Sequence, residues 1–140
     1  MRVEPYLFYN GRCEEAIEFY KRAIGANVEM LMRFKEAPPG EGPPMPPGTE
    51  NKIMHASLKV GDGALMMSDG ECKGQPDFKG FSLSLDAKDE ADAKRLFNAL
   101  AEGGQVRMPL TKTFFSPSFG MVGDRFGLGW MIIVNQQEHH

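Results

Sequence analysis

The fold is decided by one stretch, Ser118-Phe119-Gly120-Met121-Val122-Gly123-Asp124-Arg125-Phe126-Gly127-Leu128-Gly129-Trp130-Met131-Ile132-Ile133-Val134. Two apolar runs of strand composition flank a Gly-Asp-Arg-Phe-Gly turn, which predicts a β-hairpin with a loop longer than two residues. A weaker copy lies upstream, from His55 to Asp69, and Val-Gly-Asp ends the first strand of both hairpins, at Val60 and at Val122. The repeat indicates a duplicated architecture.

The residues before the upstream hairpin predict a strand, a helix and a second strand. Val3 to Tyr9 has strand composition and ends at the turn signal Asn10-Gly11. From Arg12 to Ile24, apolar residues recur at helical spacing and Gly25 supplies the stop. Asn27 to Lys35 then alternates as a half-buried strand, with apolar residues at Val28, Met30, Met32 and Phe34. Together with the hairpin, these elements form a first module over about residues 1–69.

The second module, over about residues 79–135, follows the same plan. Phe81 to Leu85 alternates as a strand. Asp89 is placed to cap a helix that Gly103-Gly104 stops, and its apolar face is formed by Ala93, Leu96, Phe97 and Leu100. Gln105 to Phe115 predicts either a pair of strands or one bent strand interrupted at Pro109. Each half therefore reads as strand, helix and three strands, and we expect residues 1–137 to form a single α+β domain of two βαβββ modules.

An insertion distinguishes the first half from the second. Glu36 to Asn51 spans 16 residues and contains six prolines, which exclude a helix or a central strand. Its length accounts for nearly all of the difference in spacing between the two halves. The segment has two interpretations, as a solvated connector or as a lid or dimer arm.

Composition excludes several classes of partner. The chain has 140 residues, 16 basic and 19 acidic, and a formal charge of -3 without a basic stripe, so we expect no nucleic acid and no membrane surface as partner. Cys13 and Cys72 match neither a metal spacing nor a dense disulfide framework, which favours the reducing cytoplasm. The N-terminus lacks a signal-peptide pattern, and the closing residues 138–140 read as a tag remnant, so His139 and His140 enter no metal argument.

Four segments, in order, carry a family resemblance. They are Pro5-Tyr6-Leu7-Phe8-Tyr9-Asn10-Gly11 with Cys13-Glu14-Glu15-Ala16 and Phe19-Tyr20; Met54-His55-Ala56 with Val60-Gly61-Asp62; Leu65-Met66-Met67-Ser68-Asp69; and Phe119-Gly120-Met121-Val122 with Asp124-Arg125-Phe126-Gly127 and Trp130. The chain resembles the vicinal oxygen chelate superfamily of glyoxalase I, ring-cleaving dioxygenases and bleomycin and fosfomycin resistance proteins, and within it the PhnB-like group. The resemblance implies curved, cupped mixed sheets of the glyoxalase/bleomycin resistance type, a concave pocket and a homodimer.

In metal-using relatives, four ligands project inward from equivalent strand positions. By register these positions fall near Pro5, Met67, Phe81 and Met131, none of which is a good ligand for a divalent metal. A shift of one residue does not restore the set, since the neighbours are Tyr6, Met66, Ser82, Trp130 and Ile132. We therefore expect no metal site and no cofactor, while a divalent metal is the disfavoured alternative.

The expected ligand pocket combines aromatic residues, methionines and one histidine: Tyr6, Phe8, His55, Met66, Met108, Phe115, Phe119, Met121 and Trp130. Adaptable, polarizable side chains of this kind suit a hydrophobic or planar ligand, although core filling explains them too. His55 is either a general base, and so a weak catalytic candidate, or a satisfied strand histidine. Arg33, Arg107 and Arg125 each read as a partner for an anionic group or as a solvated surface residue.

Three functions follow from the residues and the resemblance. The first is metal-independent binding of a small organic ligand, and the alternative is a divalent-metal-dependent lyase, isomerase or dioxygenase of the glyoxalase type. The third is a structural dimer with a closed pocket. Relatives have also carried a demethylubiquinone methyltransferase label, but the sequence has no Gly-rich loop between a strand and a helix for a nucleotide-like cofactor.

Overall fold

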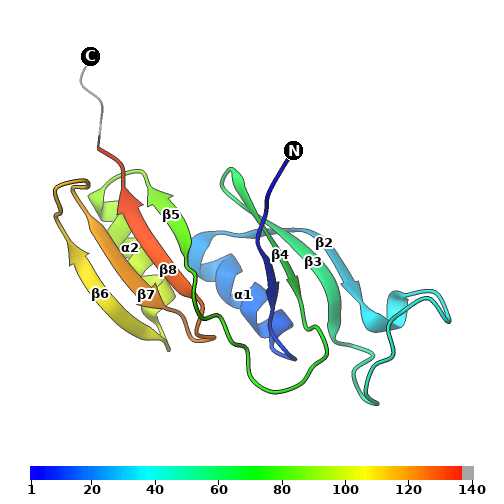
Figure 1. The fold of residues 1–140 in the computed structure, drawn as a ribbon. Coiled ribbons are helices and arrows are strands. Elements are labelled where there is room, and N and C mark those ends of the chain that lie inside the picture. The colour runs from blue at the N-terminus through cyan, green and yellow to red at the C-terminus, as the bar shows by residue number, and fades with distance from the viewer. Residues whose placement is uncertain (137–140) are drawn as a thin grey trace. The chain divides into compact units, whose positions relative to one another are not determined.

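The computed structural model describes residues 1–136 and divides into two compact units, residues 1–76 (unit 1) and the remainder from Asp77 (unit 2). Each unit contains one α-helix and four strands, which Figure 1 draws as a coiled ribbon and arrows. Unit 1 contains β1 Tyr6–Phe8, α1 Cys13–Ile24, β2 Asn27–Arg33, the short 3-10 helix η1 Phe34–Glu36, β3 Ile53–Val60 and β4 Gly63–Ser68. Unit 2 contains β5 Leu83–Ala87, α2 Glu90–Ala101, β6 Gln105–Thr111, β7 Phe119–Gly123 and β8 Gly129–Val134. The expected tag remnant lies outside the described residues.

The two sheets have the same topology. Unit 1 has the strand order β1-β4-β3-β2 and unit 2 the order β5-β8-β7-β6. In each unit the first strand pairs parallel with the last, and the other two pairings are antiparallel. This confirms the duplicated βαβββ plan and the α+β fold, because a parallel pairing requires the crossover connection that the helix and the middle strands provide.

The two helices begin in different ways. α1 has Arg12 at its N-cap without a side-chain hydrogen bond, and it ends at Gly25, whose φ of 70° is left-handed. α2 is capped as expected by Asp89, whose carboxylate accepts a 2.8 Å hydrogen bond from the backbone N–H of Asp92. The buried residues of α2 are the expected four, Ala93, Leu96, Phe97 and Leu100.

Three expectations for the strands need correction. β1 covers only part of the expected range from Val3 to Tyr9. β6 is a single strand that continues through Pro109, which is tolerated because β6 lies at the sheet edge and is irregular on both sides of Met108. β2 is less buried than its alternation indicates, since the side chain of Met30 is 46% exposed.

The proline-rich insertion joins β2 to β3 as an extension of that hairpin. Two backbone hydrogen bonds close its base, from Phe34 N to Lys52 O at 3.1 Å and from Lys35 N to Glu50 O at 3.0 Å. Beyond η1, no strand or helix is formed between residues 37 and 52. Neither α1 nor α2 has the length and apolar character that crossing a bilayer would require.

Candidate functional site

Each sheet has one covered face and one open face. Leu7, Met67, Ala56 and Leu58 are buried on the covered face of unit 1, where α1 contacts β3. On the other face, which we call the open face, the alternating residues of the same strands are more accessible, because successive side chains point to opposite sides of a sheet. The open face of each unit is a candidate site.

The open face of unit 1 carries an aromatic and polar set. One register row across the sheet runs through Tyr6, Met66, Ser57 and Met30. Phe8 lies two residues from Tyr6 on β1, and their ring centroids are 5.2 Å apart. Tyr6 and Phe8 are 39% and 52% exposed, which is unusual for large aromatic side chains of a small domain. The expected pocket residues Tyr6, Phe8, His55 and Met66 therefore share one accessible surface.

Tyr6 and His55 form a hydrogen-bonded pair on this surface. The phenol oxygen of Tyr6 lies 2.9 Å from Nδ1 of His55. Burial raises the pKa of Tyr6, so its phenol stays protonated at neutral pH and donates the hydrogen bond when Nδ1 of a neutral His55 accepts. In that tautomer Nε2 carries the imidazole proton. The pair presents a fixed polar group beside the aromatic ring of Phe8.

The open face of unit 2 carries a row of methionines. Met131 on β8 is opposite Met121 on β7, which is opposite Met108 on β6. All three are half-buried. The next row contains Ile133 and Phe119. The expected residues Met108, Met121 and Phe119 therefore lie together, in a surface that is more apolar than its counterpart in unit 1.

Phe115 extends this surface beyond the sheet. Its ring centroid lies 5.1 Å from that of Phe119 in an edge-on arrangement, and Phe114 stacks edge-on against Phe115 at 5.2 Å. Phe114 is almost fully exposed. The three rings place aromatic area at one end of the open face of unit 2.

Trp130 lies on the other side of the sheet. It is 3% exposed, and it shares the covered face with Val122, its register partner, and with the neighbouring alternate residue Ile132. Its indole Nε1 donates a 3.0 Å hydrogen bond to Oδ2 of Asp124. The sheet thus separates Trp130 from the methionine row, and its role here is structural.

Two buried aspartates organise the backbone of the two units. Asp69 accepts hydrogen bonds from the backbone N–H groups of Gly11, Cys13 and Ile53 at 2.7–2.8 Å. Asp124 accepts from Phe126 and Leu128 in addition to Trp130. The sequence carried only one signal for Asp69, a carboxylate directly after an apolar strand.

Two of the three arginines that could bind an anion are already paired. Arg33 contacts Glu14 at 2.6 Å, and this ion pair lowers the pKa of Glu14. Arg125 contacts Glu102 at 3.3 Å. Both side chains therefore have a structural explanation, which leaves Arg107 as the arginine to be explained.

The register of the sheets corrects one position of the metal comparison. Met67 is fully buried on the covered face, whereas its neighbour Met66 lies on the open face of unit 1, as Met131 does in unit 2. Met66 and Met131 pair with Tyr6 and Ser84 on the first strand of each unit. Within residues 1–136, no group of three or more His, Cys, Asp or Glu side chains is placed to hold a metal ion.

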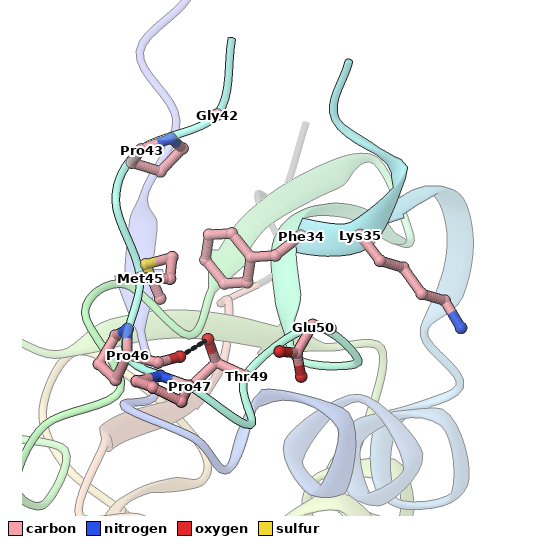
Figure 2. A pocket seen from close by; sticks show the side chains of 9 residues that line it. All are labelled: Phe34, Lys35, Gly42, Pro43, Met45, Pro46, Pro47, Thr49 and Glu50. Carbon is pink, nitrogen blue, oxygen red and sulfur yellow. Dashed lines mark hydrogen bonds between the residues drawn. The ribbon is translucent and has the colours of Figure 1, made fainter. Parts of the chain in front are cut away.

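A separate hollow of about 430 Å³ lies under the proline-rich segment. Figure 2 shows the ring of Phe34 turned toward Met45, with Lys35 pointing away. The hydroxyl of Thr49 donates a 2.7 Å hydrogen bond to the carbonyl of Pro46, which fixes the turn at one side. None of the nine lining residues belongs to the expected pocket set, so this hollow is distinct from the open faces.

Comparisons with known proteins agree with the fold. Residues 1–133 match the family described as 3-demethylubiquinone-9 3-methyltransferase. Protein YjdN of Escherichia coli K12 is 35% identical over 144 residues, which covers 99% of this chain and 98% of that protein.

Solved structures extend the comparison. Protein PA1353 from Pseudomonas aeruginosa is 44% identical and superposes with a TM-score of 0.83, covering 98% of this chain and 99% of that one. A Bacillus cereus PhnB protein, at 24% identity and a TM-score of 0.77, covers 96% and 99% of the two chains and shares the fold. The fosfomycin resistance protein FosX of Mesorhizobium loti has the same fold at 9% identity, with a TM-score of 0.65 over 97% and 92% of the chains.

Proposed function

We propose that this chain, which belongs to the 3-demethylubiquinone-9 3-methyltransferase family within the vicinal oxygen chelate superfamily, binds a small organic molecule with a large apolar surface. The observation that carries the proposal is the accessibility of the open faces. Tyr6 and Phe8 in unit 1, and the methionine row with Phe115 in unit 2, leave aromatic and thioether atoms uncovered. Surfaces of this composition suit ligands of variable shape, because methionine adapts its rotamers to what it contacts.

The donor atoms of the open faces do not fit a divalent metal. The paired open-face residues of the first and last strands are Tyr6 with Met66 in unit 1 and Ser84 with Met131 in unit 2, which supply a phenol, a hydroxyl and two thioethers. His55 adds one imidazole, but within residues 1–136 no group of three or more His, Cys, Asp or Glu side chains is placed to hold a metal ion. Zinc and the harder divalent ions favour imidazole, thiolate or carboxylate ligands. Binding without a metal is therefore the function that we propose.

The family description names a methyl transfer, which is not part of this proposal. The first strand of each unit leads into its helix through a short turn, ending at Arg12 in unit 1 and at Asp89 in unit 2. Neither turn has the glycine-rich sequence that brings a backbone close to a nucleotide-like cofactor.

A ligand screen with site-specific variants tests the proposal. Thermal-shift measurements with planar aromatic and aliphatic compounds should give at least one that raises the melting temperature in a concentration-dependent way. Met66→Gln or Met121→Gln should weaken that shift, because each adds a polar group to an open face. Met45→Gln, in the hollow under the proline-rich segment, is the matched control and should leave the shift unchanged. A shift lost only in Met45→Gln would move the site to the hollow.

The proposal includes association into a homodimer. Contiguous exposed apolar area is costly in water, and Tyr6, Phe8 and Met30 contribute such area to one face of unit 1. Light scattering coupled to size exclusion should give a mass near twice 15.6 kDa. A mass of one chain across the micromolar range would remove the dimer from the proposal without affecting ligand binding.

A further inference from the structure

We infer that the open face of unit 2 binds an apolar molecule through a single carboxylate, which Arg107 receives. This inference rests on the proposed function and specifies the class of ligand. Three features of the Arg107 guanidinium support it: its position over two glycines, its single long hydrogen bond and the apolar side chains near it.

The Arg107 guanidinium rests on a platform of two glycines. A Cβ atom added to Gly123 would lie 2.6 Å from Nη2 of Arg107, and one added to Gly129 would lie 2.8 Å from Nη1. Gly123 and Gly129 are register partners at the end of the hairpin next to its loop. Their missing side chains would point to the open face, as those of Met121 and Met131 do. The guanidinium therefore occupies space that any other residue at either position would fill.

A strand irregularity turns Arg107 toward this platform. In a regular strand, Arg107 and Met108 would point to opposite faces of the sheet. The pairing of β6 with β7 shifts between Val106 and Met108, so Arg107 and Met108 both reach the open face. Bulges of this type commonly re-aim a side chain next to a functional site.

No carboxylate neutralises this cation within residues 1–136. The hydrogen bond that Arg107 makes is long, 3.4 Å from Nη2 to the carbonyl of Gly127. Arg33 and Arg125, by contrast, are held by Glu14 and Glu102. The guanidinium of Arg107 keeps most of its donors for another acceptor, and a planar fork of this kind matches a carboxylate in a bidentate manner.

The surroundings indicate one negative charge and an apolar body. Ser82 places its hydroxyl 2.6 Å from the same Cβ position of Gly129, so a neutral donor lies on the same side of this glycine as the guanidinium. Met131 lies two residues along β8 from Gly129, roughly 7 Å at the rise of a strand. A carboxylate on Arg107 would therefore hold an attached ring or chain over the methionine row.

A matched set of probes tests the inference. 2-Naphthylacetic acid, its primary amide and 2-naphthylmethylphosphonic acid share one apolar body and differ in the polar group. Binding is followed by the methyl signals of ¹³C-labelled methionines and by calorimetry. The wild-type protein should bind the acid about ten-fold or more tightly than the amide, as expected for charge-assisted hydrogen bonds to a guanidinium.

Variants assign the preference to Arg107. In Arg107→Gln the acid and the amide should bind with similar affinity, and Arg107→Lys should retain only part of the preference. Gly129→Ala should also reduce it, because the added methyl group displaces the guanidinium. Gly63→Ala in the other hairpin places its methyl group 3.4 Å from the carbonyl oxygen of Val60, away from Arg107, and should not reduce the preference. Arg125→Gln is the control for loss of a positive charge near the same loop.

Each outcome separates the two proposals. Equal affinities for acid and amide in the wild-type protein would overturn the inference and leave apolar binding intact. Tighter binding of the phosphonate than of the carboxylate would overturn the assignment to a single charge. If none of the three probes perturbs a methionine methyl signal, the inference and the open face of unit 2 as a binding surface both fail.

Discussion

The two units begin their helices by different means, although their strands pair alike. The first turn of α2 is capped locally, because the carboxylate of Asp89 accepts a hydrogen bond from the backbone N–H of Asp92, three residues later. The first turn of α1 is capped from a distance, because Asp69 at the end of β4 receives the N–H groups of Gly11 and Cys13 and, with its other oxygen, that of Ile53. A duplicated topology therefore does not require duplicated local stabilisation. In unit 1 the single carboxylate of Asp69 binds backbone N–H groups at the start of the helix and of β3. In unit 2 Asp89 caps the helix and Asp124 binds the N–H groups of the hairpin loop.

The β3–β4 hairpin of unit 1 and the β7–β8 hairpin of unit 2 also share a sequence motif but differ in how its aspartate is bonded. Val-Gly-Asp ends a strand in both, yet Asp62 is exposed in a two-residue turn whereas Asp124 is buried and accepts three hydrogen bonds in a longer one. The loop length decides the outcome, because only the longer loop folds its own N–H groups back around the carboxylate. Asp62 and Asp124, although they match in sequence, should therefore contribute unequally to the free energy of unfolding.

Replacement of Asp69 by alanine should have the largest effect. Three N–H groups from two segments, one part-buried at Gly11 and two buried at Cys13 and Ile53, would lose their acceptor, at about 1–3 kcal/mol each when unsatisfied. We expect a loss of at least about 3 kcal/mol in the free energy of unfolding, measured by urea denaturation. Asp62→Ala is the matched control and should change stability by less than about 0.5 kcal/mol. Comparable losses in the two variants would contradict the distinction between them.

Replacement of Asp124 should rank second. Asp124→Ala removes the acceptor of two loop N–H groups and of the Trp130 indole, but all three belong to one hairpin that can partly rehydrate. We expect a loss of about 2 kcal/mol and a shift of the tryptophan fluorescence spectrum that Asp69→Ala does not produce in the folded state. An unchanged spectrum would argue against the indole hydrogen bond.

The local cap of α2 should matter less than either. Asp89→Ala removes one hydrogen bond to a partly exposed helix end and should cost about 1 kcal/mol, as N-cap replacements typically do. Asp89→Ser keeps an acceptor and is the control. Hydrogen exchange should increase in the first turn of α2 and stay unchanged in α1, since α1 depends on Asp69. A matching increase in α1 would show that the two ends are coupled.

The smallest expected effects are electrostatic. Arg33 holds the pKa of Glu14 below its usual range in unit 1, and Arg95 does the same to Asp92 in unit 2. Each depressed pKa stabilises the folded state above the ordinary carboxyl range, and this contribution is lost as the pH falls through the folded-state pKa. Arg33→Gln should raise the pKa of Glu14, followed by NMR titration, and leave that of Asp92 unchanged. Arg95→Gln should do the reverse.

Much of the fold could be predicted from the sequence because its signals are local. The helix over Cys13–Ile24 has its apolar spacing and its Gly25 stop, and α2 has its Asp89 cap. The hairpin of β7 and β8 has its turn between two apolar runs. Each of these signals determines the structure of residues that lie within a few positions of it in the sequence.

The candidate site was less accessible to prediction because it depends on which face a residue occupies. Trp130 and Met131 are adjacent and apolar, yet one is buried beside Val122 and the other lies on the open face. Asp69 could not be identified, since its donors are up to 58 positions away. Arg107 reaches the open face because the pairing of β6 with β7 is irregular, and the alternation of residues in the sequence does not indicate this irregularity.

The closed base of the proline-rich segment has a consequence for how the chain tolerates change. The two backbone hydrogen bonds that join Phe34 to Lys52 and Lys35 to Glu50 fix the register of β2 against β3 before the segment leaves the sheet. Residues 37–49 can therefore lengthen, shorten or be exchanged for a foreign peptide while the strands stay aligned. The segment is a natural position for grafting, where new recognition can be added to an unchanged scaffold.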